Sequence, residues 1–199
     1  MTVALRLLGV GAMASPRFAP AGLLVEAPDA RVMLDGGPGA TPDPPLTAWL
    51  VTDERAELIA VIRRLGRSIG VEPAAAPFRS PTLSIERLPV VHTARPTWGY
   101  RIEHAGRCAV WAPEFLEFPP WARQADLIFA DAAGWARPIR FRGAVGGHAA
   151  ALQVAADARA NGVRRLVFAH LGRPTLRALD AGELPPFGEI GREGATYEL

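Results

Sequence analysis

Short apolar runs separated by glycine, proline and aspartate occupy the first half of the chain. Runs of this kind, bounded by residues that favour turns, predict β-strands. The predicted strands are Val3–Leu8, Ala21–Ala27, Arg31–Leu34, Leu46–Thr52, Leu83–Val91, Thr97–His104 and Arg107–Trp111. Pro28-Asp29 and Ala105-Gly106 lie between consecutive runs and predict tight turns. The first half is therefore expected to form hairpins and a meander.

Helical periodicity appears in three segments, two of them in the second half of the chain. The predicted helices are Asp53–Arg67, His148–Asn161 and Thr175–Ala181, and the further predicted strands are Ala125–Asp131 and Arg164–Ala169. In the first helix Leu58, Ile62 and Leu65 share one face, and Asp53 is the predicted N-cap. Strands first, with helices between later strands, predict a layered α/β protein with mixed sheets. Because no long linker divides the chain, residues 1–199 are expected to form one domain.

Composition and charge restrict the class of protein and the kind of partner that we expect. With 199 residues, 49% of them hydrophobic, the chain can bury a sizeable core. The basic residues number 22, all of them arginine, against 20 acidic residues, and this balance does not favour nucleic acid as a partner, although it does not exclude it. One cysteine excludes a disulfide framework. No signal peptide or membrane-spanning run is evident, so we expect a cytoplasmic protein without membrane contact.

Motifs rich in glycine or placed at strand ends follow one another in a fixed order. In the first half they are Leu7–Gly11, Gly22–Glu26 and Val32–Gly37. In the second half they are Val91-His92, Gly99–Ile102, Ala125–Asp131, Gly147-His148 and Leu166–His170. Together they resemble metallo-β-lactamase-fold phosphodiesterases, with the ribonuclease Z-type and phosphoribosyl cyclic phosphodiesterase-like branches nearest. The resemblance implies an αββα metallo-β-lactamase-like sandwich of two mixed β-sheets, with the site at the rim of the sheets.

The chain departs from this family at the motif that gives the family its metal site. A His-x-His-x-Asp-His motif should follow Thr52, but residues 53–58 read Asp-Glu-Arg-Ala-Glu-Leu. Asp53 and Glu57 keep oxygen atoms that can bind a metal, whereas Leu58 cannot. Arg55 places a permanent positive charge where the family holds a cation. The motif is therefore degenerate, and a standard site with two metal ions is not expected.

The resemblance also implies roles for residues in the second half. It places metal-ligand positions at His92, Asp131 and His170, and it matches His148 to a catalytic histidine that protonates a leaving phosphate oxygen. At most one divalent ion, zinc or manganese, is expected, held by some of these residues with Glu57 or Asp53. The alternative is a pocket without metal, in which Arg55 replaces the charge of the missing ion.

Arginines near the implied site are candidates for binding phosphate. Arg55 lies in the degenerate motif, and Arg140 and Arg142 precede His148. For the last two, a solvent-exposed loop is the competing interpretation. We expect Arg55 to form a salt bridge with Asp131 or Glu57, because a buried guanidinium requires a carboxylate partner.

Two functions remain open from the sequence. The first is a metal-dependent hydrolase that acts on a phosphodiester or on another phosphoester derived from a nucleotide. The second is a catalytically inactive relative that binds a phosphorylated ligand or a protein partner, and the sequence leaves open whether two copies form a homodimer. Both hypotheses require His92, Asp131 and His170 to converge at one rim, since each lies at the end of an apolar strand.

Overall fold

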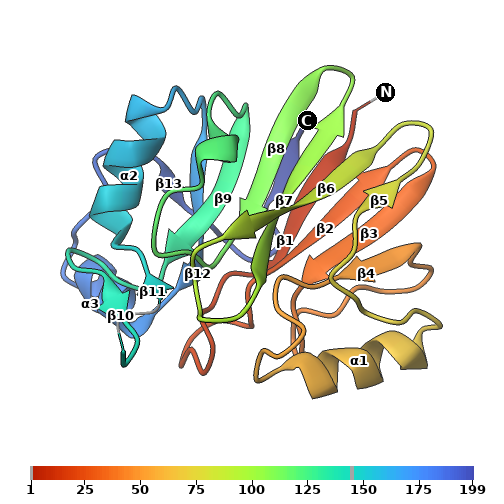
Figure 1. Ribbon diagram of the computed structural model, residues 1–199, viewed down its shortest axis with the longest axis horizontal. Coiled ribbons are helices and arrows are strands. Elements are labelled where there is room, and N and C mark those ends of the chain that lie inside the picture. Colours follow the sequence, from red (N-terminus) through yellow and green to blue (C-terminus); the bar gives the residue numbers. More distant parts are fainter. Residues whose placement is uncertain (1, 144–145) are drawn as a thin grey trace.

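Two β-sheets packed face to face form the centre of the molecule, with helices outside them (Figure 1). The computed structural model describes residues 2–143 and 146–199. One sheet has the order β14-β1-β2-β3-β4, formed by Thr196–Glu198, Ala4–Gly9, Gly22–Ala27, Ala30–Asp35 and Ala48–Leu50. The other has the order β13-β12-β9-β8-β7-β6-β5, formed by Glu189–Ile190, Leu166–Leu171, Leu127–Ala132, Arg107–Ala112, Thr97–His104, Ser84–Val90 and Phe78–Arg79. Both sheets contain parallel and antiparallel pairs, so the expected two-sheet sandwich is confirmed.

Alternation along the strands of the first sheet places apolar side chains on both of its faces. Leu23 and Val25 of β2 belong to the core between the sheets. Leu24 and Met33 point the other way and form a second cluster with Ile62. Ile62 belongs to α1 (Ile59–Ser68), which therefore covers the outer face of this sheet near β4.

Two parallel strands in the second sheet are buried along their whole length. Every residue of β9 and β12 is buried, as their continuous apolar sequences predict. The helix α2 (Ala151–Ala160) packs on β9 and β12 and covers their outer side, and α3 (Arg173–Asp180) follows β12 directly. Within the described part of the chain, no helix is long and apolar enough to cross a bilayer.

The two longer helices begin later than the sequence predicts. Residues 53–58 form turns, and α1 begins at Ile59, because Asp53 Oδ1 accepts a hydrogen bond from the Arg55 backbone N–H at 2.7 Å and closes a local turn. The segment before α2 is also extended, since Gly147-His148 pairs as β11 with β10 (Ile139–Arg140). Both predicted helix starts, Asp53 and His148, are therefore wrong, and both residues lie in loops or short strands that can carry functional groups.

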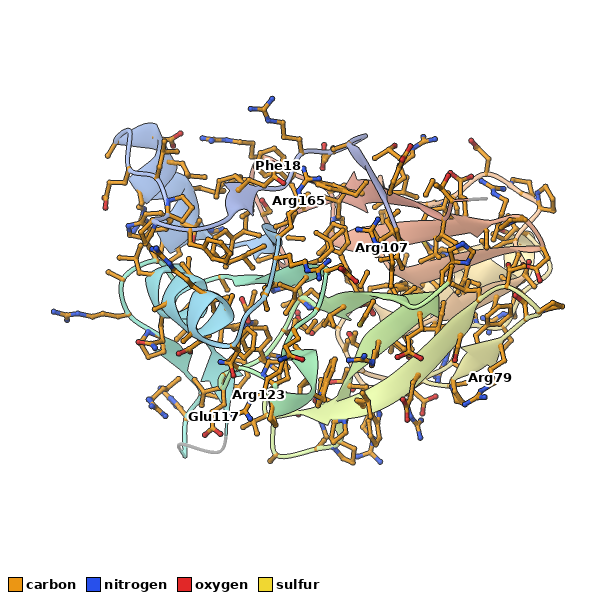
Figure 2. The ribbon with its side chains drawn as sticks, turned by 90° about the horizontal axis from the view of Figure 1, so that it is seen from above. Phe18, Arg79, Arg107, Glu117, Arg123 and Arg165 are labelled. Carbon is orange, nitrogen blue, oxygen red and sulfur yellow. The ribbon has the colours of Figure 1, made fainter. Side chains whose placement is uncertain are left out.

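Most charged side chains lie on the surface of these layers. Arg79, Arg123, Arg165 and Glu117, labelled in Figure 2, are all exposed, and Arg79 lies on the opposite side of that view from Arg123 and Glu117. The arginines are therefore spread over the surface. The polar groups that are deeply buried gather instead at one rim, where β8, β9 and β12 end.

Candidate functional site

A cavity of about 880 Å³ opens at the rim where the strands of both sheets end. Its floor and walls come from the β1–β2 loop, the residues after β3, β4, β6 and β8, the β10–β11 pair and the start of α3. The polar residues that line it are Asp35, Thr52, Asp53, Arg55, Glu57, His92, Thr93, Arg95, Glu114, His148, His170 and Arg173. The topology thus brings together groups that are far apart in the sequence.

His148 and Asp131 form a hydrogen-bonded pair beside the cavity. The His148 Nδ1–H donates to Asp131 Oδ2 at 2.8 Å, and the His148 side chain is 13% exposed. Asp131, which is fully buried, also accepts the backbone N–H of Phe115 at 3.0 Å and that of Ala133 at 2.8 Å. Burial lowers the pKa of His148, but the charge and hydrogen bond of Asp131 outweigh it, so this pKa lies above its usual value. The pair is therefore suited to hold a protonated imidazole.

His92 is oriented by backbone groups of the loop that carries His148. Its Nδ1–H donates to the Gly147 carbonyl at 2.9 Å, and the Gly147 N–H donates back to the His92 carbonyl at 2.8 Å. A side chain at Gly146 would collide with the His92 carbonyl oxygen, so the close approach requires glycine there. Because Nδ1 is engaged, Nε2 is the His92 atom that faces the cavity side chains.

Glu114 is the carboxylate that faces the histidine cluster. Its Oε2 lies 3.7 Å from His92 Nε2, and its Oε1 lies 3.5 Å from His170 Nε2. Burial alone would raise the pKa of Glu114, but the three imidazoles of His170, His92 and His148 outweigh burial and hold this pKa below its usual value. The ring of His148 lies between the other two histidines, with centroids 4.7 Å from His92 and 5.2 Å from His170. Three histidines and two carboxylates therefore form one connected cluster.

The pKa of His170 is shifted in the direction opposite to that of His148. Burial lowers the pKa of His170, and its carboxylate neighbours do not compensate for that burial, so this pKa lies below its usual value. Two nearly parallel imidazoles in one cavity, with an interplanar angle of 18°, thus have pKa values shifted in opposite directions. Such a pair can serve as acid and base in a single reaction.

The segment 53–58 contributes side chains to the cavity, but Arg55 does not form the salt bridge that we expected. Arg55 and Glu57 line the cavity and are exposed, and Leu58 is half-buried there. Among the described residues no ion pair joins Arg55 to Asp131 or to Glu57, so the predicted salt bridge is wrong. The physical reason is that Asp131 is already bound to His148 and to two backbone N–H groups, while Arg55 reaches solvent and needs no buried partner.

The donor set does not fit the metal centre that the fold implies. A zinc site needs three or four ligand atoms at about 2.0–2.3 Å from one point. His92 and His170 face different carboxylate oxygens of Glu114. Both oxygens of Asp131 accept hydrogen bonds from groups of the protein itself. Asp53 is likewise occupied by the Arg55 N–H, and its Oδ2 lies 3.9 Å from Arg95. In residues 2–143 and 146–199, no group of three or more His, Cys, Asp or Glu side chains is arranged to hold an ion.

Several of the predicted site residues therefore need correction. Asp131 orients His148 instead of facing a common metal point, and Arg140 and Arg142 are exposed outside the set of residues that line the cavity. The arginines that do line it, besides Arg55, are Arg95 and Arg173. Glu114 was missed, although it follows the end of the apolar strand β8 and so occupies the same kind of position as the predicted residues.

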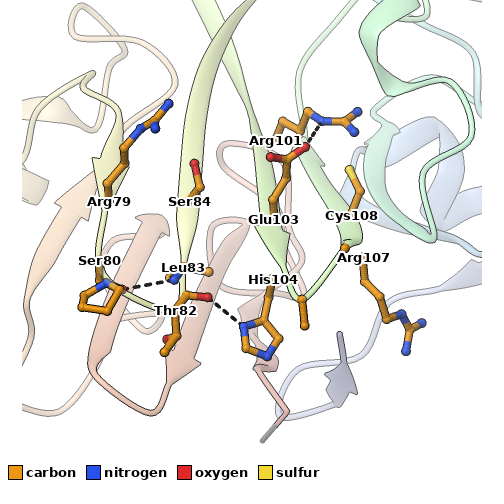
Figure 3. A pocket seen from close by; sticks show the side chains of 13 residues that line it. Arg79, Ser80, Thr82, Leu83, Ser84, Arg101, Glu103, His104, Arg107 and Cys108 are labelled. Atoms are coloured by element: carbon orange, nitrogen blue, oxygen red, sulfur yellow. Dashed lines mark hydrogen bonds and ion pairs between the residues drawn. The ribbon is translucent and has the colours of Figure 1, made fainter.

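A second, smaller hollow of about 360 Å³ lies at the other end of β8, across β5, β6 and β7 (Figure 3). Arg101 is bound there to Glu103 at 2.8 Å, and the His104 Nδ1–H donates to the Thr82 carbonyl at 2.8 Å. His104 is half-buried there. Because these groups satisfy one another and lie far along the strands from the histidine cluster, the larger cavity is the better candidate site.

No protein-family model and no curated protein matches the sequence. Solved structures do match it over nearly its whole length. The metallo-β-lactamase-fold protein YhfI from Bacillus subtilis is 17% identical, with a TM-score of 0.74 and coverage of 100% of both chains. A diphosphatase from the PhnP family is 16% identical, with a TM-score of 0.70 and coverage of 100% of this chain and 98% of that one.

A third match is Zn(2+)-bound PqqB from Methylobacterium extorquens, which is 16% identical with a TM-score of 0.69 and coverage of 98% of this chain and 100% of PqqB. Identities this low establish a common architecture and do not transfer an activity. These matches extend over both facing mixed sheets and the outer helices, since they cover 98–100% of this chain. The chain therefore has the metallo-β-lactamase fold.

Proposed function

We propose that this protein binds a phosphoester in the rim cavity and hydrolyses it, with His148 as the general acid. The observation that carries the proposal is the hydrogen bond of 2.8 Å between His148 and the fully buried Asp131, which favours the protonated form of an imidazole at the edge of the cavity. Arg55, Arg95 and Arg173 line the same cavity and offer positive charge to a phosphoryl group.

The reaction needs a proton donor and a proton acceptor at one phosphorus atom. Water attacks phosphorus, the bond to the leaving oxygen breaks, and the His148 imidazolium transfers its proton to that oxygen. His170, in which burial lowers the pKa and so favours the neutral imidazole, accepts the proton of the attacking water. Glu114 lies 3.5 Å from His170 and stabilises the imidazolium that results. Atoms and protons then balance without a co-reactant.

The proposal assigns catalysis to side chains and requires no resident zinc or manganese ion. It rests on the donor set, since Arg55 and Leu58 replace two positions of the degenerate motif and Asp131 is engaged elsewhere. The same replacements support the competing proposal, a protein that binds a phosphorylated ligand without turnover. Measuring both ligand binding and turnover distinguishes the hydrolase from the protein that only binds its ligand.

The test is hydrolysis of bis(4-nitrophenyl) phosphate and of a 2′,3′-cyclic nucleotide by the purified chain, with and without a chelator. We expect turnover that survives the chelator and that falls by about 10²–10⁴ in His148→Ala. His104→Ala, a histidine at the opposite end of β8, is the matched control and should retain the activity. Equal rates for the wild type and His148→Ala would overturn the role of His148. Ligand binding without any turnover would favour the inactive alternative.

A further inference from the structure

Apolar side chains also line the rim cavity, a feature that the acid–base chemistry does not explain. Those larger than alanine are Met13, Pro20, Leu58, Ile62, Pro113, Ile139, Phe141 and Pro174. They come from separate segments of the chain, and Leu58 stands in the degenerate motif itself. The ligand class inferred from these side chains rests on the proposed function, because the ligand would occupy the same cavity.

Three of these side chains gather around one point above Gly37. A Cβ atom at Gly37 would lie 3.6 Å from Pro20 Cγ, 3.7 Å from Leu58 Cδ1 and 3.9 Å from Ile62 Cγ1. The three side chains therefore converge on one position beside Gly37. All three also line the cavity.

Phe141 is the apolar side chain of the cavity that contacts the histidines. Its ring lies edge-on to His92, with centroids 5.4 Å apart, and edge-on to His148, with centroids 5.6 Å apart. A ligand whose leaving oxygen reaches His148 therefore also comes within reach of the Phe141 ring. Apolar contact and proton transfer are available to one and the same molecule.

Two of the large apolar side chains that line this cavity are exposed. Four large hydrophobic side chains are exposed among the described residues: Met13 at 46%, Val91 at 46%, Phe141 at 36% and Leu184 at 76%. Met13 and Phe141 both line the cavity. An exposed apolar surface beside charged groups is typical of a ligand-binding site, since isolated surface hydrophobics do not converge on one hollow.

We propose that the ligand is a phosphoester of an apolar group, an aryl or branched alkyl moiety, with the phosphoryl group at the histidines and the apolar group against Leu58, Ile62 and Phe141. Hydroxyl groups of a sugar would find no hydrogen-bond partner on that surface and would lose their hydration there. Leu58 is then a specificity-determining residue as well as a lost ligand position.

The test measures binding, so that it does not depend on turnover. Phenylphosphonate and methylphosphonate carry the same charged group and differ in the apolar group, and their affinities for the full chain are compared by calorimetry. We expect phenylphosphonate to bind at least about tenfold more tightly, because most of its ring would be removed from water. Met13→Gln and Leu58→Gln should both reduce that ratio.

Leu184→Gln is the matched control, since it changes an exposed apolar side chain outside the set that lines the cavity. Met13 is exposed, so Met13→Gln keeps the test valid if Leu58→Gln does not fold. Equal affinities of the two phosphonates for the wild type would overturn the apolar subsite and leave the proposed function standing. Failure of both phosphonates to bind would overturn the phosphoester proposal itself.

Discussion

The carboxylate of Asp131 accepts three hydrogen bonds in a fully buried environment, from two backbone N–H groups and from His148. An asparagine in its place presents an amide N–H₂ toward donors and removes the charge that stabilises the imidazolium. We expect Asp131→Asn to lower the free energy of unfolding by about 1–3 kcal/mol, and to lower the pKa of His148. Urea unfolding measures the first effect and an NMR titration of the imidazole the second. Asp180→Asn, an exposed carboxylate bound to Arg17, should change neither value.

The raised pKa of His148 also predicts a pH dependence of stability. Because the folded-state pKa lies above the unfolded value of about 6.5, protonation of His148 stabilises the fold. This contribution is complete below a pH of about 6.5, and it is lost as the pH rises through the folded-state pKa. The free energy of unfolding should therefore fall as pH rises above about 6.5, and His148→Asn should remove most of that slope. The lowered pKa of His170 has the opposite effect, since its contribution to the free energy of unfolding is lost as the pH falls below about 6.5. An unchanged slope in His148→Asn would show that another group titrates.

At the level of elements, the segment between β4 and α1 decides what the cavity can hold. Arg55 supplies a fixed positive charge there, and Leu58 supplies no donor atom. Replacing both with histidine adds two ligands near His92, Glu114 and His170 and removes the charge. We expect the double variant to retain about one zinc ion per chain after dialysis, measured by elemental analysis. Arg67→His, on the exposed last turn of α1, is the control. Two tightly bound ions in the wild-type protein would contradict this account.

For the whole molecule, one buried hydrogen bond ties the two sheets together. Trp111 Nε1–H of β8 donates to Asp35 Oδ2 at the end of β3, at 2.7 Å. Burial raises the pKa of Asp35 to about 7, and the Trp111 hydrogen bond opposes that rise. Trp111→Phe leaves the carboxylate without this donor and opens a small cavity, so we expect a loss of about 2–4 kcal/mol in the free energy of unfolding.

Circular dichroism in urea should show this loss as one cooperative transition, because both sheets share the core that Trp111 fills. Trp121→Phe provides the comparison, since its Nε1–H donates to Pro89 at the surface. A similar loss in both variants would contradict the role of the bond between the sheets.

The order and type of the elements could be predicted from local patterns. The predicted strands Ala125–Asp131 and Thr97–His104 correspond to β9 and β7, and the predicted helix Thr175–Ala181 corresponds to α3. Such segments are read from the period of their apolar residues, which a single stretch of sequence contains in full. The short strands β10, β11 and β13 were not predicted, because a strand of two residues carries no period and is recognised only by the strand that pairs with it.

The candidate site could be predicted only in part, because its contacts join residues that are far apart in the sequence. The sequence by itself indicated that His92, Asp131 and His170 lie at or just beyond strand ends, and hence at one rim, whereas it placed His148 at the start of a helix. Only the tertiary structure decided that Asp131 binds His148 and that Glu114 faces His92 and His170. Which carboxylate meets which imidazole depends on the direction of each side chain where its strand ends. Contacts between residues far apart in the chain set that direction, and no local pattern records them.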